Sequence, residues 1–111
     1  MNPPSNPLEQ TWWIIDNPQV AGELITLTAG EVKYALVFSK LEVAQTFLFG
    51  LNDSSLTLVT LNSWVMKDAF LTAAKILGAT RVMFDYVPGL QSAPSAALEN
   101  LIELMHKRIG S

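Results

Sequence analysis

The chain has 111 residues, of which half are hydrophobic and 15% are charged, and its formal net charge at pH 7 is −3. A chain of this length fits one domain with much surface for its volume, so part of its apolar excess is expected to stay exposed or to lie at an interface. The acidic balance disfavours nucleic acid as a partner, and the absence of cysteine excludes disulfides, thiolate metal sites and a cysteine nucleophile.

The chain begins with a proline-rich segment, which has three prolines in its first seven residues. Such a segment is extended or disordered, so we expect a tail over residues 1–9 and a single α/β domain over residues 10–111. The tail lacks the basic and apolar regions of a signal peptide, and no apolar run approaches the roughly 18 residues of a membrane span. We therefore expect a cytoplasmic protein that does not enter a membrane.

Three β-prone runs follow the tail. Residues 11–15 are rich in aromatic and branched side chains and stop at the turn signal Asp16-Asn17-Pro18. Residues 23–28 and 32–38 are separated by a short loop that contains Gly30, which is typical of an antiparallel hairpin.

Helical and β patterns then alternate to the end of the chain. Ser39 and Glu42 have the spacing of a capping box at a helix start, and Gly50 suits the end of that helix. The expected elements are a helix over 40–49, a strand over 56–61, a helix over 63–77, a strand over 81–86 and a C-terminal helix that starts near residue 92 or 94.

The helix over 63–77 has the clearest amphipathic pattern in the chain. Its apolar residues recur at helical spacing and predict the buried face, with the charged residues on the other side. The predicted buried face is Met66, Ala69, Phe70, Ala73, Ala74 and Leu77, and the predicted polar side is Lys67, Asp68, Thr72 and Lys75.

The pattern as a whole predicts an α+β fold, in the form of an α/β-type two-layer sandwich. Strands that alternate with helices favour parallel pairing with right-handed crossovers. We expect a mixed sheet of about five strands, in which an N-terminal antiparallel hairpin is followed by a β-α-β-α-β unit and a C-terminal helix. Alternation places Val82, Phe84 and Tyr86 on one face of the last strand. One sheet face is strongly apolar and is expected to carry the helices, whereas the other is mixed and partly open.

Two segments also show a family resemblance. They are Lys33-Tyr-Ala-Leu-Val-Phe-Ser-Lys-Leu-Glu42, which runs from a strand into a helix, and Val65-Met-Lys-Asp-Ala-Phe-Leu-Thr-Ala-Ala-Lys-Ile-Leu-Gly-Ala79, which precedes a strand. This order, over about residues 30–90, resembles the SseB-like family. The resemblance implies an α/β domain and offers no catalytic residues to carry over.

Side chains that can perform catalysis are few and scattered. His106, the single histidine, lies in the last turn of the predicted C-terminal helix, where a cation complements the helix dipole. The chain contains no metal-binding loop, no phosphate-binding glycine motif and no Gly-x-Ser-x-Gly elbow. An enzymatic mechanism would have to centre on Lys40 and Asp85 and is the least favoured alternative. We therefore predict no enzyme activity, no cofactor and no metal site.

The ends of the three central strands suggest a ligand site. If strands 32–38, 56–61 and 81–86 are parallel, their carboxyl ends meet at one edge, where ligands of open α/β sheets bind and helix N-termini favour anions. Alternatively, the serines and the asparagine only cap helices while the tryptophan packs against the helix start. The candidate ligand-binding residues are Ser39, Lys40, Asn62, Ser63, Trp64, Asp85 and Tyr86.

Trp12 and Trp13 are neighbours, so on a strand their rings point to opposite faces. One ring can enter the core, and the other either contacts a partner or packs under the N-terminal tail. With the apolar excess, this pair favours a non-enzymatic protein-interaction module that is homo-oligomeric, joined through the mixed sheet face or the N-terminal strand, with a second protein as a possible partner. The alternative is a small-molecule or anion-binding regulatory domain that uses the carboxyl edge of the sheet.

Overall fold

The computed structural model describes residues 9–17, 26–88 and 93–110, within which six strands and three helices follow one another. The predicted tail, apart from Glu9, lies outside the described residues, as do Pro18 of the predicted turn and the start of the predicted strand over 23–28. The elements are β1 (Trp12–Asp16), β2 (Thr26–Ala29), β3 (Val32–Val37), α1 (Leu41–Leu51), β4 (Thr57–Leu61), α2 (Trp64–Ile76), β5 (Arg81–Phe84), β6 (Ser95–Ala97) and α3 (Leu98–Gly110).

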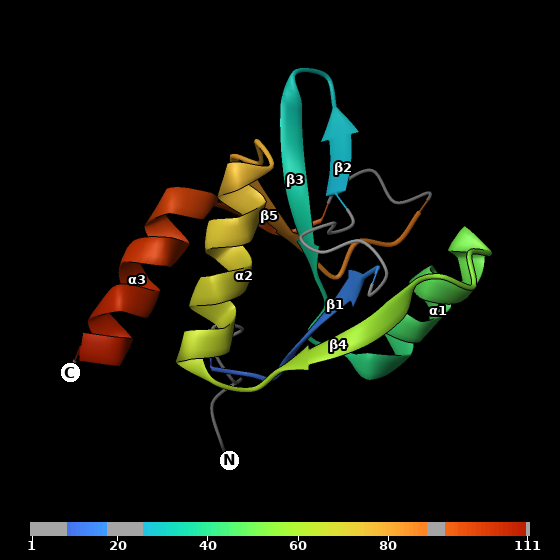
Figure 1. The fold of residues 1–111 in the computed structure, drawn as a ribbon. Coiled ribbons are helices and arrows are strands. Elements are labelled where there is room, and N and C mark those ends of the chain that lie inside the picture. The colour runs from blue at the N-terminus through green and yellow to red at the C-terminus, as the bar shows by residue number, and fades with distance from the viewer. Residues whose placement is uncertain (1–8, 18–25, 89–92, 111) are drawn as a thin grey trace, which may run out of the picture.

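The strands form two sheets that meet at one bridge (Figure 1). The larger sheet has the order β2-β3-β5-β6, in which β3 and β5 are parallel and the two outer pairs are antiparallel. β1 and β4 form the second sheet as an antiparallel pair. The sheets are joined where the main chains of Trp13 and Phe38 exchange hydrogen bonds of 2.8 and 2.9 Å.

The α+β class is confirmed, but the strands are divided between two sheets instead of forming one sheet of five. β5 pairs with one edge of β3, and β2 and the Trp13 bridge occupy the other edge. No edge of β3 is left for β4, which pairs with β1 instead. The parallel pairing expected for residues 56–61 is therefore wrong, because β4 pairs with β1, to which it is antiparallel.

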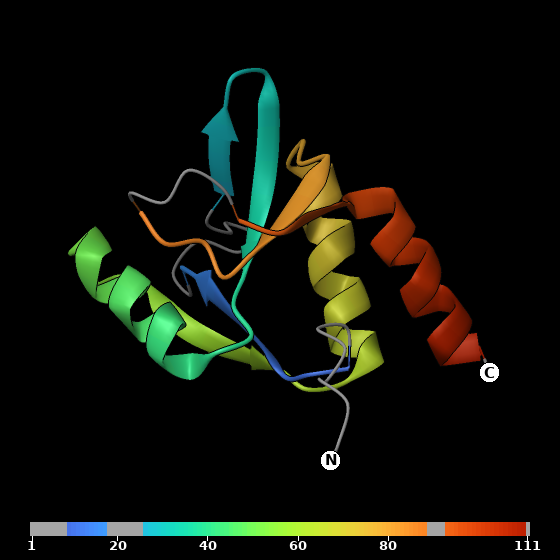
Figure 2. The ribbon, with the colours of Figure 1, turned by 180° about the vertical axis from the view of Figure 1, so that it is seen from behind.

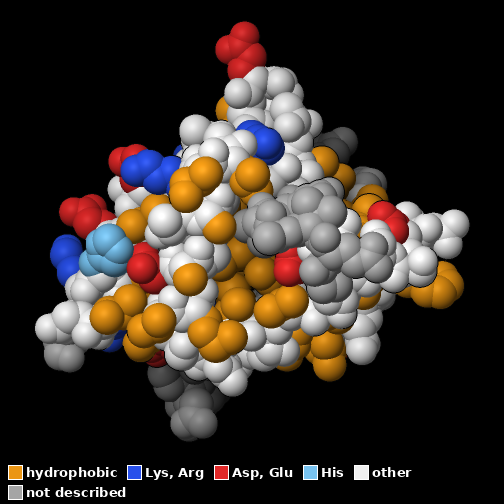
Figure 3. All heavy atoms as spheres, viewed as in Figure 1, with side chains coloured by type: hydrophobic (Ala, Val, Ile, Leu, Met, Phe, Trp, Pro, Cys, Tyr) orange, Lys and Arg blue, Asp and Glu red, His pale blue; other side chains and the backbone are white. Residues whose placement is uncertain are grey.

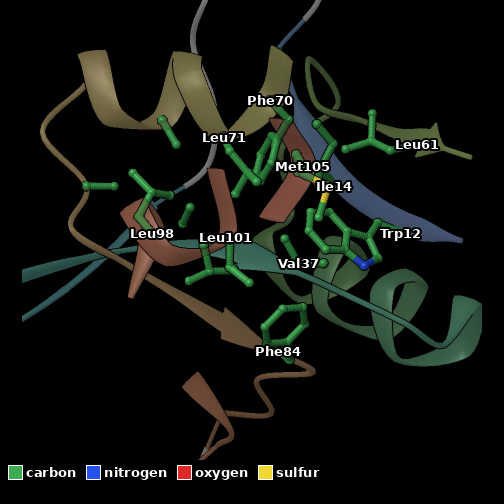
Figure 4. Close-up of a cluster of buried hydrophobic side chains, with 14 residues drawn as sticks. Trp12, Ile14, Val37, Leu61, Phe70, Leu71, Phe84, Leu98, Leu101 and Met105 are labelled. Carbon is green, nitrogen blue, oxygen red and sulfur yellow. The ribbon is translucent and has the colours of Figure 1, made fainter. Parts of the chain in front are cut away.

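Helices cover both faces of this strand layer, as the opposite views of Figures 1 and 2 show. On one face α2 and α3 pack over β3 and β5 around a core that includes Trp12, Phe70 and Leu71 (Figure 4). On the other face α1 packs its Ala44 against Leu36 and Phe38. On the face that was expected to be partly open, α1 covers the part near β1, β4 and the end of β3.

Several local predictions are confirmed and others are corrected. Ala29 pairs with Val32 in the expected hairpin, and Gly30 takes the positive φ of +63° that its tight turn requires. α1 ends at Asn52, in the left-handed region at φ 51°, and not at Gly50. β6 was not predicted, because its sequence Ser-Ala-Ala has no β-forming pattern and the strand exists only by pairing with β5.

The buried face of α2 differs from the predicted one. The helix buries Lys67, Phe70, Leu71 and Ala74, whereas Met66, Ala69 and Leu77 are exposed. In the observed rotation of the helix, Leu71 is fully buried. In the predicted rotation, Ala69 would be buried instead, and its side chain is only a methyl group. As a result, much of the apolar stripe of α2 faces away from the core.

Candidate functional site

The parallel neighbours β3 and β5 end side by side, and there Asp85 is bonded to Ser39. One carboxylate oxygen of Asp85 accepts the Ser39 N–H at 2.8 Å, and the other accepts the Ser39 hydroxyl at 2.5 Å. The N–H of Asp85 donates to the carbonyl of Val37 at 2.9 Å, and its φ is +55°. The sequence-predicted pair Ser39 and Asp85 is therefore brought together at this edge.

This bonding corrects the predicted capping box of Ser39 and Glu42. The N-cap of α1 is Lys40, which makes no side-chain capping bond, and the Ser39 hydroxyl bonds to Asp85 instead. The hydroxyl donates to a carboxylate, which makes this hydrogen bond charge-assisted. Lys40 itself is exposed beside this pair.

The other half of the predicted site lies elsewhere, because β4 belongs to the second sheet. Ser63 is confirmed as the N-cap of α2, where its hydroxyl accepts the Met66 N–H at 3.1 Å, and Asn62 is exposed beside it. Trp64 packs against the core under α2 and α3, whereas Tyr86 packs on the α1 face. Asn62, Ser63 and Trp64 therefore do not share a site with Tyr86.

A groove of about 220 Å³ lies between α1 and the segment that follows β5. Tyr86 was predicted on the face of Val82, but the left-handed turn at Asp85 directs its ring to the α1 side, where it meets Phe47 edge-on at 5.8 Å. Sequence reasoning missed Phe47, although Val43 and Phe47 lie one helical turn apart and were the available signal. The groove is lined by Glu42, Val43, Thr46, Phe47, Tyr86, Val87 and Pro88.

Lys67 is buried, with only 3% of its surface exposed, although its pattern predicted a polar, solvent-facing position. Its ammonium nitrogen donates to the carbonyl of Gln10 at 2.6 Å and lies 5.0 and 4.8 Å from the ring centres of Trp12 and Trp64. Desolvation by burial lowers the pKa of Lys67, and the negative charge of Glu9 opposes this effect. The cluster fastens the N-terminal segment to α2.

The two neighbouring tryptophans point to opposite faces, as predicted. Trp12 is fully buried and meets Phe84 edge-on, with ring centres 5.7 Å apart. Trp13 is partly buried and packs on the α1 face. Because the ring of Trp12 is enclosed by its own chain, it offers no surface to a partner, which corrects its predicted role at an interface.

The single histidine, His106, takes part in a contact between α3 and α2. His106 Nε2 lies 3.1 Å from Oδ1 of Asp68, and Lys75 forms an ion pair with Glu99 at 2.9 Å. Within the described part of the chain, no three His, Cys, Asp or Glu side chains are grouped to hold a metal ion. None of the helices described is both long and apolar enough to cross a membrane.

The outer face of α2 carries several exposed apolar side chains. Val65 is 62% exposed and Ile76 is 80% exposed, at opposite ends of the same helix. Figure 3 shows apolar side chains over this helix and onward toward β1 and β4. We define the outer face of α2 as Val65, Met66, Ala69, Ala73, Ile76 and Leu77.

Together, the fold and these surfaces define a small α+β domain with an apolar exterior on one helix and a shallow groove at the strand ends. The chain belongs to the family described as "Protein of unknown function (DUF3234)", which it matches over residues 9–102, from just before β1 into α3. No curated protein matches the chain. The family match does not bear on the resemblance to the SseB-like family, which stays a prediction.

Proposed function

We propose that this protein is a non-enzymatic interaction module that associates with a second copy of itself through the outer face of α2. The observation that supports the proposal is the exposure of Val65 and Ile76 on a helix whose opposite side is buried. Burial of apolar surface contributes about 25 cal/mol per Å², so covering this face would stabilise an assembly. Exposed apolar patches of this kind commonly mark protein–protein contacts.

The order of side chains along the outer face suits self-association about a two-fold axis. The large residues lie at its ends, with Val65 and Ile76 roughly 16 Å apart at 1.5 Å per residue. Ala69 and Ala73 lie between them, and small side chains allow two helices to approach closely. In an antiparallel pair, Val65 of one copy would meet Ile76 of the other, so the same surface serves both partners.

The charges around the outer face also favour an uncharged partner surface. No residue of the outer face is charged, and the nearby Asp68 and Lys75 already contact His106 and Glu99 of α3. Covering the face would therefore not bury a charged side chain of the face itself, which would be costly. A second copy, with the same uncharged face, meets this condition.

The test is the molar mass in solution, measured by light scattering at micromolar concentrations. We expect the unaltered protein to self-associate and the double variant Val65→Glu with Ile76→Glu to have a lower molar mass, because it places carboxylates in the contact. Phe49→Glu is the matched control, since Phe49 is 88% exposed on α1 and lies outside the outer face. A monomeric unaltered protein, or a double variant with the same molar mass as the unaltered protein, would contradict the proposal.

A second candidate function is ligand binding at the groove beside Asp85. Its volume of about 220 Å³ is smaller than the roughly 300–1,000 Å³ of drug-sized sites, so it suits a small apolar molecule. Glu42 is the charged residue among the lining side chains described, which favours a neutral or cationic ligand over an anion. The Ser39–Asp85 pair has both carboxylate oxygens occupied and would act only as a support.

Nuclear magnetic resonance titration with 2-phenylethylamine tests this candidate. We expect shifts that cluster at Phe47 and Tyr86, are weakened by Tyr86→Ala and are unchanged by Tyr34→Ala, because Tyr34 lies in β3 outside the lining set. Shifts scattered over the molecule, or none at these rings, would exclude the site.

A further inference from the structure

The outer edge of β4 has no partner among the described residues. β1 occupies one edge of β4, with an unbroken register from Trp12 opposite Leu61 to Asp16 opposite Thr57. An unpaired edge presents a row of N–H and C=O groups that can bond to another strand.

The direction of these groups follows from the bridge between the two sheets. Trp13 bonds to Phe38 through both its N–H and its C=O, so both groups point away from β4. In an antiparallel ladder, the residue opposite then also turns its groups outward, and that residue is Thr60. Leu58, two positions earlier, has the same orientation because it lies opposite Ile15. The outward groups of β4 are therefore those of Leu58 and Thr60.

β4 lacks the features that usually protect an edge strand. Natural edges carry charges, proline or a bulge that prevents pairing with another chain. Here no residue from Ser54 to Met66 is charged or is proline, and the register with β1 contains no bulge. The side chain of Thr60 is exposed and uncharged, so it would not repel an identical strand.

We infer that β4 pairs antiparallel with β4 of a second copy, about a two-fold axis at Val59. This register places Leu58 of one copy opposite Thr60 of the other, so each outward N–H and C=O of these residues meets a partner. Val59 then lies opposite itself, and the strands form a continuous sheet in the order β1, β4, β4, β1.

A second copy fits this edge because the strand is its own complement. The two outward residues are symmetrically placed around Val59, and neither copy brings a charge to the contact. This edge contact is distinct from the outer face of α2, so it goes beyond the proposed function and either contact can fail alone. A chain with both contacts would form an assembly larger than a dimer.

Disulfide trapping tests the register, since the chain has no cysteine of its own. In the inferred register, two copies of Val59 form a pair without hydrogen bonds, with Cα atoms about 4.5 Å apart, a distance that a disulfide spans. Val59→Cys should therefore form a cross-linked dimer rapidly under mild oxidation. Thr57→Cys is the matched control on the same sheet face, because its two copies lie four positions apart along the strand, or about 13 Å. We expect at least a tenfold slower cross-link for the control.

A second variant separates edge pairing from random collision. The N–H of Thr60 points away from β1, so Thr60→Pro removes a bond to the second copy and leaves the β1–β4 ladder intact. Combined with Val59→Cys, Thr60→Pro should abolish the cross-link while circular dichroism stays unchanged; Thr60→Lys should do the same if the proline variant unfolds.

The background Val65→Glu with Ile76→Glu distinguishes the two proposals. Cross-linking through Val59→Cys in this background supports the edge contact whether or not the outer face of α2 associates. Equal cross-linking of the Val59→Cys and Thr57→Cys proteins, or none for Val59→Cys, would overturn the inference.

Discussion

The side chain of Lys67 crosses from α2 to the N-terminal segment, where its ammonium group meets the carbonyl oxygen of Gln10. The rings of Trp12 and Trp64 both lie within cation–π distance of it. Helical periodicity alone assigns a lysine to the solvent side, so this position was not predictable from the sequence of α2. It depends on Gln10, which is far away in the chain.

The lowered pKa of Lys67 predicts a pH dependence of stability. The unfolded chain keeps this proton up to about the ordinary pKa of 10.5, whereas the folded chain releases it at lower pH. Between the two values folding releases a proton, so the contribution of Lys67 to the free energy of unfolding rises with pH. Below the lowered value both states are protonated and the contribution is constant.

Urea denaturation of the protein and of Lys67→Met measures this effect. The difference in unfolding free energy, unaltered protein minus variant, should increase as the pH rises toward 10.5. Lys40→Met is the control for removal of a lysine charge, since Lys40 is exposed at the start of α1. A difference that falls with rising pH would show that the rings and Gln10 stabilise the charge more than burial destabilises it.

At the scale of elements, the bond between Ser39 and Asp85 joins the exit of β3 to the exit of β5. The sequence predicted that both residues lie at the carboxyl edge, because parallel strands end together. It did not predict that they bond to each other, since Ser39 with Glu42 fits a helix cap equally well. Only the parallel pairing of β3 and β5 decides between these partners.

We expect Asp85→Ala to lower the free energy of unfolding by about 2–4 kcal/mol, because it removes both bonds to Ser39 and places alanine in the left-handed region. Asp85→Asn tolerates this conformation and keeps an acceptor, and Ser39→Ala keeps the main-chain bond, so each should cost about 1 kcal/mol. Urea denaturation gives these values.

Asp53→Ala is the matched control for this series. Asp53 also accepts an N–H and a hydroxyl, both from Ser55, but it lies in an exposed turn. Its replacement should change stability little. Equal losses for the Asp53 and Asp85 variants would mean that the bond to β3 has no special role.

For α2, the sequence pattern predicts the position of the helix but not its rotation about its own axis. Its position, its N-cap at Ser63 and its end near Gly78 followed from the sequence, because capping and glycine signals are local. Its rotation did not, since Leu71 and Ala69 both suit a helix and only the shape of the neighbouring core selects Leu71. The groove residue Phe47 was missed for the same reason.

For the whole molecule, the order of elements was largely predictable and the partition of strands was not. The hairpin of β2 and β3 and the parallel direction of β3 and β5 follow from loop length and alternation, whereas the strand order does not. The separation of β1 and β4 depends on which edges of β3 are already filled, and this is a property of the assembled structure. The candidate ligand site was divided for the same reason, because Asn62, Ser63 and Trp64 follow β4 whereas Asp85 and Tyr86 follow β5.

The described chain begins and ends at one corner of the molecule, where Glu9 and Arg108 approach each other to 3.5 Å. Because segments at the two ends of the described chain contact each other, the protein is a candidate for circular permutation, with new ends opened at an exposed turn such as that around Gly30.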